Sequence, residues 1–197
     1  MSDRRRLVVG ISGASGIVYG IRILEALRTL DVESHLIVSR GARRTLAMET
    51  AMSLTELHAL ADVVYAPADL GAAVSSGSFR TLGMVVAPCS VRTLSQIAHG
   101  FGDNLLARAA DVTVKERRRL VLMVRETPLT LTHIRNMATA TENGAIIAPP
   151  VPAFYTNPGR LSDVVDQSAG RVLDLFGLDT AAFPRWGEEL QVPAGAA

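Results

Sequence analysis

The sequence predicts an α/β protein in which helices cover both faces of a doubly wound parallel sheet, giving three layers. Short apolar runs that suit buried strands alternate with segments whose apolar residues recur at helical spacing. The first apolar run is followed at once by glycines and serines and then by a helical pattern, which together make the front half of a βαβ unit. Strands and helices that alternate in this way favour a parallel sheet.

The elements follow one another in a regular order. The predicted strands are residues 7–11, 34–38, 82–87, 120–124 and 145–148. The predicted helices are 17–27, 41–52, a short one opened by the capping box at 53–56, one ending at residue 99, 103–119, 130–142 and 161–176. The segment 62–78, rich in Ala, Gly and Ser, is expected to be a loop with little regular structure. The proline-rich segment 149–155 is expected to be extended and stiff.

Composition excludes several classes of protein. The 197 residues are 48% hydrophobic and 20% charged, which is enough to bury the core of one well-packed domain. A net charge of +1 with dispersed basic residues gives no field for nucleic acid. No apolar stretch is long enough for a signal peptide or a membrane span. The single cysteine fits a reducing cytoplasm, and no histidine or cysteine spacing indicates a metal site.

The glycine turn after the first strand is the first candidate for ligand binding. Its spacing is Gly10-x-x-Gly13-x-x-Gly16, and the helix start behind it is expected to offer unpaired N–H groups to a phosphate, beside the hydroxyls of Ser12 and Ser15. The Lys-Ser or Lys-Thr pair of a P-loop is missing. The dinucleotide pattern is also missing, because the second strand ends in Ser39-Arg40 rather than in an acid. A mononucleotide or another phosphate remains open, as does a turn without a ligand.

The parallel topology predicts a functional edge of the sheet. Ligands of such sheets bind beyond the carboxyl ends of the strands. Those ends carry small hydroxyls, a glycine turn, one arginine and one carboxylate, namely residues 13–16, Ser39, Cys89, Ser90, Arg125 and Glu126. This set suits a polar, phosphorylated and planar ligand. Cys89 is expected to be a small buried packing residue, and His35 to be structural.

Seven motifs in register resemble one known family. They are Gly13-Ala14-Ser15-Gly16, Pro88-Cys89-Ser90, residues 104–111, Lys115-Glu116-Arg117-Arg118, Arg125-Glu126-Thr127-Pro128, residues 149–155 and Pro184-Arg185-Trp186-Gly187. Together they resemble the flavin prenyltransferases, the UbiX-type proteins, from about residue 7 to 189. The resemblance implies a single flavoprotein domain over residues 1–190 with a Rossmann-like (flavodoxin-like) fold, followed by a flexible tail at 191–197.

The resemblance implies a metal-independent prenyl transfer in the cytoplasm. Family members transfer a dimethylallyl group from dimethylallyl phosphate to N5 and C6 of reduced FMN. The product, prenylated FMN, serves a UbiD-type decarboxylase. The chain has no Asp-Asp-x-x-Asp run to hold magnesium, so cationic side chains would neutralise the leaving phosphate. The family forms homododecamers, and the apolar proline-rich segment and residues 183–186 are candidate interface material.

The resemblance also assigns roles to single residues. The residues that match FMN contacts are Gly13, Ala14, Ser15, Ser39, Ser90, Val91, Arg92, Thr93 and Arg125. The residues that match the prenyl-phosphate cradle are Arg108, Lys115, Tyr155 and Arg171. Glu49 and Glu126 match the acid/base carboxylates, and Ser15 would help to protonate the leaving phosphate. Glu49, Tyr155 and Arg171 are expected to come from different chains around one flavin.

Other interpretations stay open. Arg108 and Lys115, seven residues apart, could be ordinary exposed charges of a helix. Many relatives have a Trp where this chain has Leu70-Gly71, which removes an aromatic side chain from the site. One alternative function is a non-catalytic, flavin-binding accessory subunit of an aromatic-acid decarboxylase. A less favoured one is a flavin-dependent cysteine decarboxylase, because residues 88–93 differ from that family's segment and no histidine lies in a suitable loop.

Overall fold

The computed structural model describes residues 4–181 and 183–185. Within these residues the chain builds a six-stranded parallel sheet in the order β3-β2-β1-β4-β5-β6. The strands are β1 (Arg6–Ile11), β2 (Glu33–Val38), β3 (Val63–Tyr65), β4 (Gly83–Cys89), β5 (Arg119–Val124) and β6 (Ala145–Ile147). The order reverses at β1, and the ends of β1 and β4 therefore open a crevice at the carboxyl edge.

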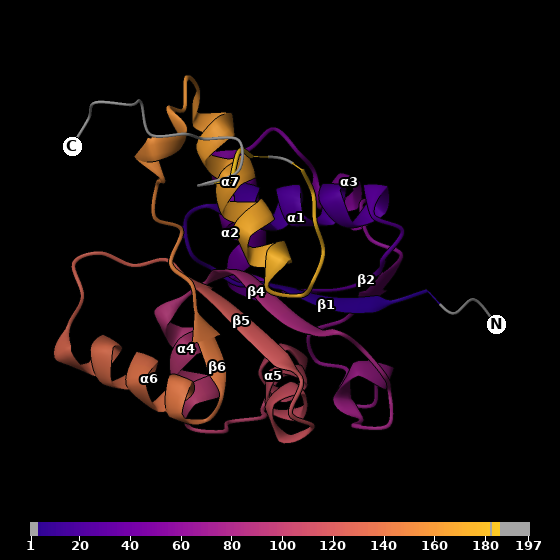
Figure 1. Cartoon of the computed structure of the whole chain (residues 1–197). Coiled ribbons are helices and arrows are strands. Elements are labelled where there is room, and N and C mark those ends of the chain that lie inside the picture. Colours follow the sequence, from indigo (N-terminus) through magenta and orange to yellow (C-terminus); the bar gives the residue numbers. More distant parts are fainter. Residues whose placement is uncertain (1–3, 182, 186–197) are drawn as a thin grey trace.

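Helices cover both faces of this sheet (Figure 1). One face carries α1 (Ile17–Thr29), α2 (Arg40–Glu49), α3 (Leu54–His58) and α7 (Leu161–Asp174). The other carries α4 (Val91–Ala98), α5 (Leu105–Lys115) and α6 (Leu131–Glu142). The predicted three-layer, doubly wound α/β fold is confirmed. None of the helices in the described ranges is long and apolar enough to cross a membrane.

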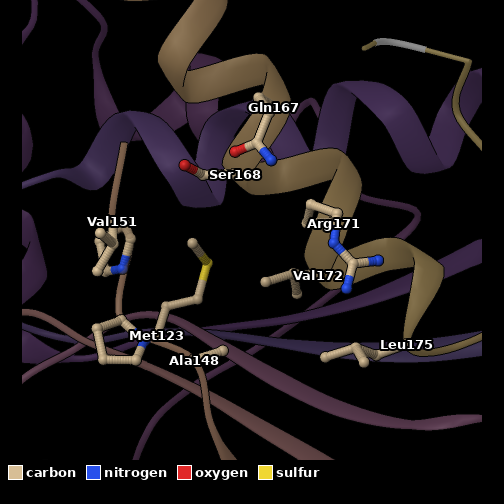
Figure 2. Close-up of a pocket in the computed structure, with 10 residues that line it drawn as sticks. Met123, Ala148, Val151, Gln167, Ser168, Arg171, Val172 and Leu175 are labelled. Carbon is tan, nitrogen blue, oxygen red and sulfur yellow. The ribbon is translucent and has the colours of Figure 1, made fainter. Parts of the chain in front are cut away.

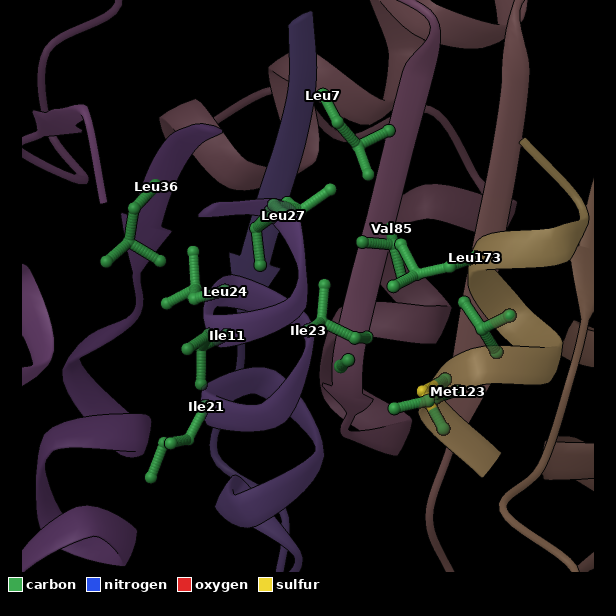
Figure 3. Packing of buried hydrophobic residues seen from close by; sticks show 14 of the residues in the cluster. Leu7, Ile11, Ile21, Ile23, Leu24, Leu27, Leu36, Val85, Met123 and Leu173 are labelled. Carbon is green, nitrogen blue, oxygen red and sulfur yellow. The ribbon is translucent and has the colours of Figure 1, made fainter. Parts of the chain in front are cut away.

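The core consists of two hydrophobic clusters, one on each face of the sheet. Alternate residues of β1 divide between them: Leu7, Val9 and Ile11 face α1, whereas Val8 faces α5. Figure 3 shows the first cluster, in which α1 and α7 lie against the strands. Both faces of the central strands are buried, as their continuous apolar runs predict, and this rigid sheet fixes the loops at its carboxyl edge.

Two segments differ from their prediction. The expected loop at 62–78 contains the edge strand β3 and the 3₁₀ turn η1 (Ala73–Ser75), and the expected extended segment ends in η2 (Phe154–Thr156). A three-residue edge strand is too short to show a period in the sequence. Without β3, the five predicted strands follow the 2-1-3-4-5 order of flavodoxin-like sheets. The predicted tail at 191–197 and the end of the 1–190 domain lie outside the described residues.

Candidate functional site

The turn after β1 holds a carboxylate at the start of α1. Glu49, the last residue of α2, accepts hydrogen bonds at Oε2 from the backbone N–H groups of Gly16 (2.9 Å) and Ile17 (3.1 Å). Gly16 has a φ of 96°, a left-handed conformation that glycine adopts readily. The prediction that this helix start offers unpaired N–H groups to a phosphate is therefore wrong, because Glu49 of the same chain occupies two of them.

The charge of Arg125 acts on both Glu49 and Tyr19. Burial raises the pKa of Glu49, but hydrogen bonds from the Ser15 side chain and two backbone amides, together with the charge of Arg125, lower it by more. Glu49 is thus kept as a carboxylate. The charge of Arg125 also acts on Tyr19, whose pKa is raised by burial and lowered in part by the arginine. Tyr19 is a half-buried phenol at the site that the sequence analysis missed.

Ser12 joins the loops that follow β1 and β4. Its fully buried hydroxyl donates to the carbonyl of Pro88 (2.9 Å) and accepts from the backbone N–H of Ser90 (2.7 Å). The predicted role of Ser12 as a hydroxyl for a phosphate is therefore wrong, because this hydroxyl is already used on both sides. Ser12 instead fixes Ser90 next to the glycine turn, a role that a sequence motif alone does not reveal.

Two helices begin at this edge with serine caps. The Oγ of Ser39 accepts from the N–H of Ala42 (3.2 Å) at the start of α2, and the Oγ of Ser90 accepts from the N–H of Thr93 (3.2 Å) at the start of α4. Helix starts leave further backbone N–H groups without intrahelical acceptors, and these favour an anion. At the same place Arg92 is exposed and Val91 is partly buried.

Gly13 lets the loop after β1 touch the start of α2. A Cβ on Gly13 would lie 2.9 Å from the Cα of Gly41, so only glycine fits without moving the backbone. Close approach of these two segments therefore explains this glycine. Next to it Ser15 is exposed and Ala14 is partly buried.

Arg125 and Glu126 follow β5 at the same edge. The backbone N–H of Arg125 donates to the carbonyl of Cys89 (3.0 Å), and this bond ties the end of β5 to the end of β4. Both side chains are exposed, and Glu126 accepts from the N–H of Thr127 (3.0 Å). The predicted flavin-binding residues thus lie at the carboxyl ends of β2, β1, β4 and β5, either in the loops there or in the first turn of α4. The convergence that the parallel topology predicts is confirmed.

Of the two predicted cationic residues of α5, Lys115 lies far from the carboxyl edge of the sheet. Lys115 ends α5 and precedes the first residue of β5, whereas Arg125 follows the last one. The six-residue strand between them spans about 20 Å. Lys115 pairs with Glu116, and Arg108 pairs with Asp111 at 2.8 Å. One chain therefore does not bring Lys115 to Glu49 and Arg125.

Arg171 borders a separate cavity of about 180 Å³. Figure 2 shows Gln167, Ser168 and Arg171 along α7, with Met123 and Val151 lining the cavity from the strand side. Arg171 pairs with Asp174 at 2.9 Å. Tyr155, in η2, is 47% exposed. Met123 belongs to β5, so this cavity lies next to the sheet.

Cys89 and His35 are structural. Cys89 is fully buried, and burial raises the pKa of its thiol, as expected for a packing residue. His35 is buried between the Tyr65 hydroxyl at Nδ1 and the Glu33 carboxylate at Nε2, both at 2.9 Å, which confirms its structural role. Across residues 4–181 and 183–185, no group of three His, Cys, Asp or Glu side chains could hold a metal ion.

Comparisons with known sequences agree with this geometry. The Flavoprotein family matches residues 1–174. The flavin prenyltransferase UbiX of Neisseria meningitidis serogroup B is 57% identical over 182 residues, covering 92% of this chain and 96% of the relative. The flavin prenyltransferase UbiX of Escherichia coli K12 is 57% identical over 185 residues, covering 92% of this chain and 98% of the relative.

Solved structures give the same result. The structure of AnUbiX (PadA1) in complex with FMN and dimethylallyl pyrophosphate has a TM-score of 0.92 and 54% identity, over 93% of this chain and 98% of that one. A dodecameric FMN-dependent Ubix-like decarboxylase from Escherichia coli O157:H7 has a TM-score of 0.90 and 47% identity, over 92% and 98%. The cypemycin decarboxylase CypD, at 20% identity and a TM-score of 0.61 over 86% and 96%, shares the fold alone.

Proposed function

Because the chain belongs to the family of UbiX-type flavin prenyltransferases, we propose that it transfers a dimethylallyl group from dimethylallyl phosphate to N5 and C6 of reduced FMN. The observation that carries this proposal is the 57% identity to named flavin prenyltransferases over 92% of the chain. The site adds a physical reason, because donors and a cation meet where parallel sheets bind planar anionic ligands.

The loops at the carboxyl edge would hold FMN. The predicted contacts are Gly13, Ala14, Ser15, Ser39, Ser90, Val91, Arg92, Thr93 and Arg125. Their chemistry suits the group: the starts of α2 and α4 present N–H groups, and Arg125 is a cation with no ion-pair partner among the described residues. Bound reduced FMN supplies the nucleophilic N5 and C6. The protein would orient the flavin through these loops.

Glu49, Ser15 and Glu126 are proposed to handle protons. Ser15 lies next to the glycine turn and acts on the ionised Glu49. To help protonate the leaving phosphate, its hydroxyl would turn from Glu49 to the phosphate, give up its proton and take another from solvent. Glu126 is an exposed carboxylate at the end of β5 and would act as the general base that removes the proton from C6.

The cations for the leaving phosphate are proposed to come from more than one copy of the chain. Arg108, Lys115, Tyr155 and Arg171 are the predicted cradle. A second copy is needed because Lys115 lies at the opposite edge of the sheet from Arg125. Glu49, by contrast, contacts the glycine turn of its own chain, so Glu49 would belong to the chain whose turn lies at the flavin, and Tyr155 and Arg171 would come from other chains. A homododecamer, as in the E. coli relative, would supply such contacts without a metal.

The proposal extends to the role of the protein in the cell. Prenylated FMN would be passed to a UbiD-type decarboxylase. The cytoplasm is the proposed location, where the one cysteine stays reduced. We also propose that residues 1–190 are a single flavoprotein domain followed by a flexible tail.

An anaerobic reaction tests the function. The full-length protein is incubated with reduced FMN and dimethylallyl phosphate, and the flavin is then analysed by mass spectrometry. We expect a flavin that is heavier by one C5 unit. Bound but unmodified FMN would contradict the proposal and favour the non-catalytic accessory subunit. Release of CO2 from a peptide that ends in cysteine would instead favour the cysteine decarboxylase. The variant Glu126→Gln should bind FMN normally and lose most of the product.

A further inference from the structure

The ammonium group of Lys115 lies against a bend of the backbone at residues 76–79. A Cβ built on Gly77 would lie 2.8 Å from Lys115 Nζ. It would also collide with Glu116 Oε1, which accepts a hydrogen bond from Lys115 Nζ. Any side chain larger than hydrogen at residue 77 would thus take the space that these two groups occupy. The lysine ammonium group thus has two neighbours: Glu116 beside it in the sequence and the backbone of Gly77 nearly forty residues away. The pairing with Glu116 alone does not fix its position.

Arg118 holds this segment in place. Its Nη1 donates to the carbonyl of Phe79 and its Nη2 to the carbonyl of Gly77, both at 2.6 Å. The backbone N–H of Arg118 donates to Thr113 of α5 at 2.9 Å, so the arginine is anchored to the same helix end as Lys115. A guanidinium that binds two carbonyls through two nitrogens fixes the direction of both carbonyls. A lysine ammonium, which acts as a point charge, does not fix them in this way.

The neighbours of Arg118 make no such contact. Arg117 and Arg119 are exposed, and the structure gives neither side chain a hydrogen bond or an ion pair within the described parts of the chain. Arg117 has a φ of 57°, and this left-handed turn lets the chain leave α5 and direct the next side chain to the 76–79 segment. Among the described residues, Arg118 is the one of these three arginines whose side chain joins two parts of the fold.

We propose that Arg118 and Gly77 are positioning residues for Lys115, and that the clamped 76–79 segment sets the place from which its ammonium group meets the prenyl phosphate. This inference rests on the proposed function. A lysine side chain has four rotatable bonds and loses much freedom when it binds a phosphate. Fixing it beforehand lowers that loss, which is the general benefit of a supported site.

Two variants test the clamp from its two sides. Gly77→Ala adds one methyl group where Lys115 and Glu116 now lie, and both are flexible side chains that can shift without unfolding the protein. Arg118→Gln removes both charge-assisted hydrogen bonds to the segment, and Arg118→Lys restores the charge without the two-nitrogen geometry of the guanidinium. Arg117→Gln removes the same charge one residue earlier and is the matched control.

The readout separates positioning from folding and from flavin binding. In the full-length protein, Gly77→Ala and Arg118→Gln should raise the KM for dimethylallyl phosphate about tenfold, the effect of weakening one charged contact. Arg118→Lys should recover part of this loss. The Kd for FMN should change less than about twofold, because the carboxyl-edge loops are untouched, and Arg117→Gln should match the wild type in the KM, the Kd and the melting temperature.

Three outcomes would overturn the inference. A KM in Gly77→Ala and Arg118→Gln equal to that of the wild type would show that Lys115 needs no support. A parallel loss of FMN binding and of melting temperature would show a purely structural clamp. An equal effect of Arg117→Gln would show that only net charge matters. Failure of the proposed function looks different, because then the wild type itself yields no prenylated flavin, and the inference falls with it.

Discussion

Replacing Ser12 by alanine removes one buried hydroxyl that joins two loops of the site. Its oxygen accepts from the Ser90 N–H at 2.7 Å, and its proton goes to the Pro88 carbonyl at 2.9 Å. After Ser12→Ala the carbonyl keeps the bond from the Ser12 backbone N–H, at 3.2 Å. The N–H of Ser90 loses its hydrogen-bond acceptor, and Ser90 remains partly buried.

The expected cost follows from that one unpaired group. A buried donor left without an acceptor costs about 1–3 kcal/mol. Taking about 2 kcal/mol for one amide, and about 2–4 °C per kcal/mol for a chain of this size, the melting temperature should fall by about 4–8 °C. FMN binding should weaken in parallel, since Ser90 begins α4 and is a predicted flavin contact.

Calorimetry and flavin fluorescence quenching measure the two effects. Ser95→Ala is the matched control: it removes a serine hydroxyl from a partly exposed position of α4, where none of the described residues forms a hydrogen bond with it, and should change stability by less than about 0.5 kcal/mol. If Ser12→Ala were as stable as Ser95→Ala and bound FMN normally, the Ser12 hydroxyl would contribute nothing measurable to stability. The inference that it holds Ser90 in place for FMN would then be refuted.

Three further variants test the electrostatics. Burial lowers the pKa of His35, although the Glu33 carboxylate raises it in part. The folded protein should therefore lose stability as the pH falls below 6.5, the ordinary pKa of histidine, and urea titrations should show a smaller loss in His35→Gln. Glu49→Gln should lower the melting temperature at pH 7 by about 1–4 °C, and this gap should narrow as the pH falls below 4.5, because the pKa of the folded carboxyl lies below that ordinary value; a gap in calorimetry as large at pH 3 as at pH 7 would contradict this. Arg125→Gln should raise the pKa of Tyr19 in ultraviolet titrations and weaken FMN binding, whereas an unchanged Tyr19 pKa would separate the two side chains.

Much of the site follows from local pattern combined with topology. The apolar run at 7–11 predicts a strand buried on both faces. Because the sheet is parallel, the segment that directly follows each strand then lies at the same carboxyl edge. For that reason Ser90 and Arg125, far apart in sequence, could be predicted to meet. The edge strand β3 could not, because three residues carry no period.

The sequence by itself determined the fold class, the family and the edge at which the flavin-binding loops gather, since these depend on apolar periodicity and on motifs that are local. Only the tertiary structure decided the partners of single side chains: that Glu49 binds the helix start of its own chain, that Ser12 holds Ser90, and that Lys115 lies at the far edge beside Gly77. Such contacts depend on side-chain direction and on loops that approach within a few ångströms, and spacing along the chain records neither.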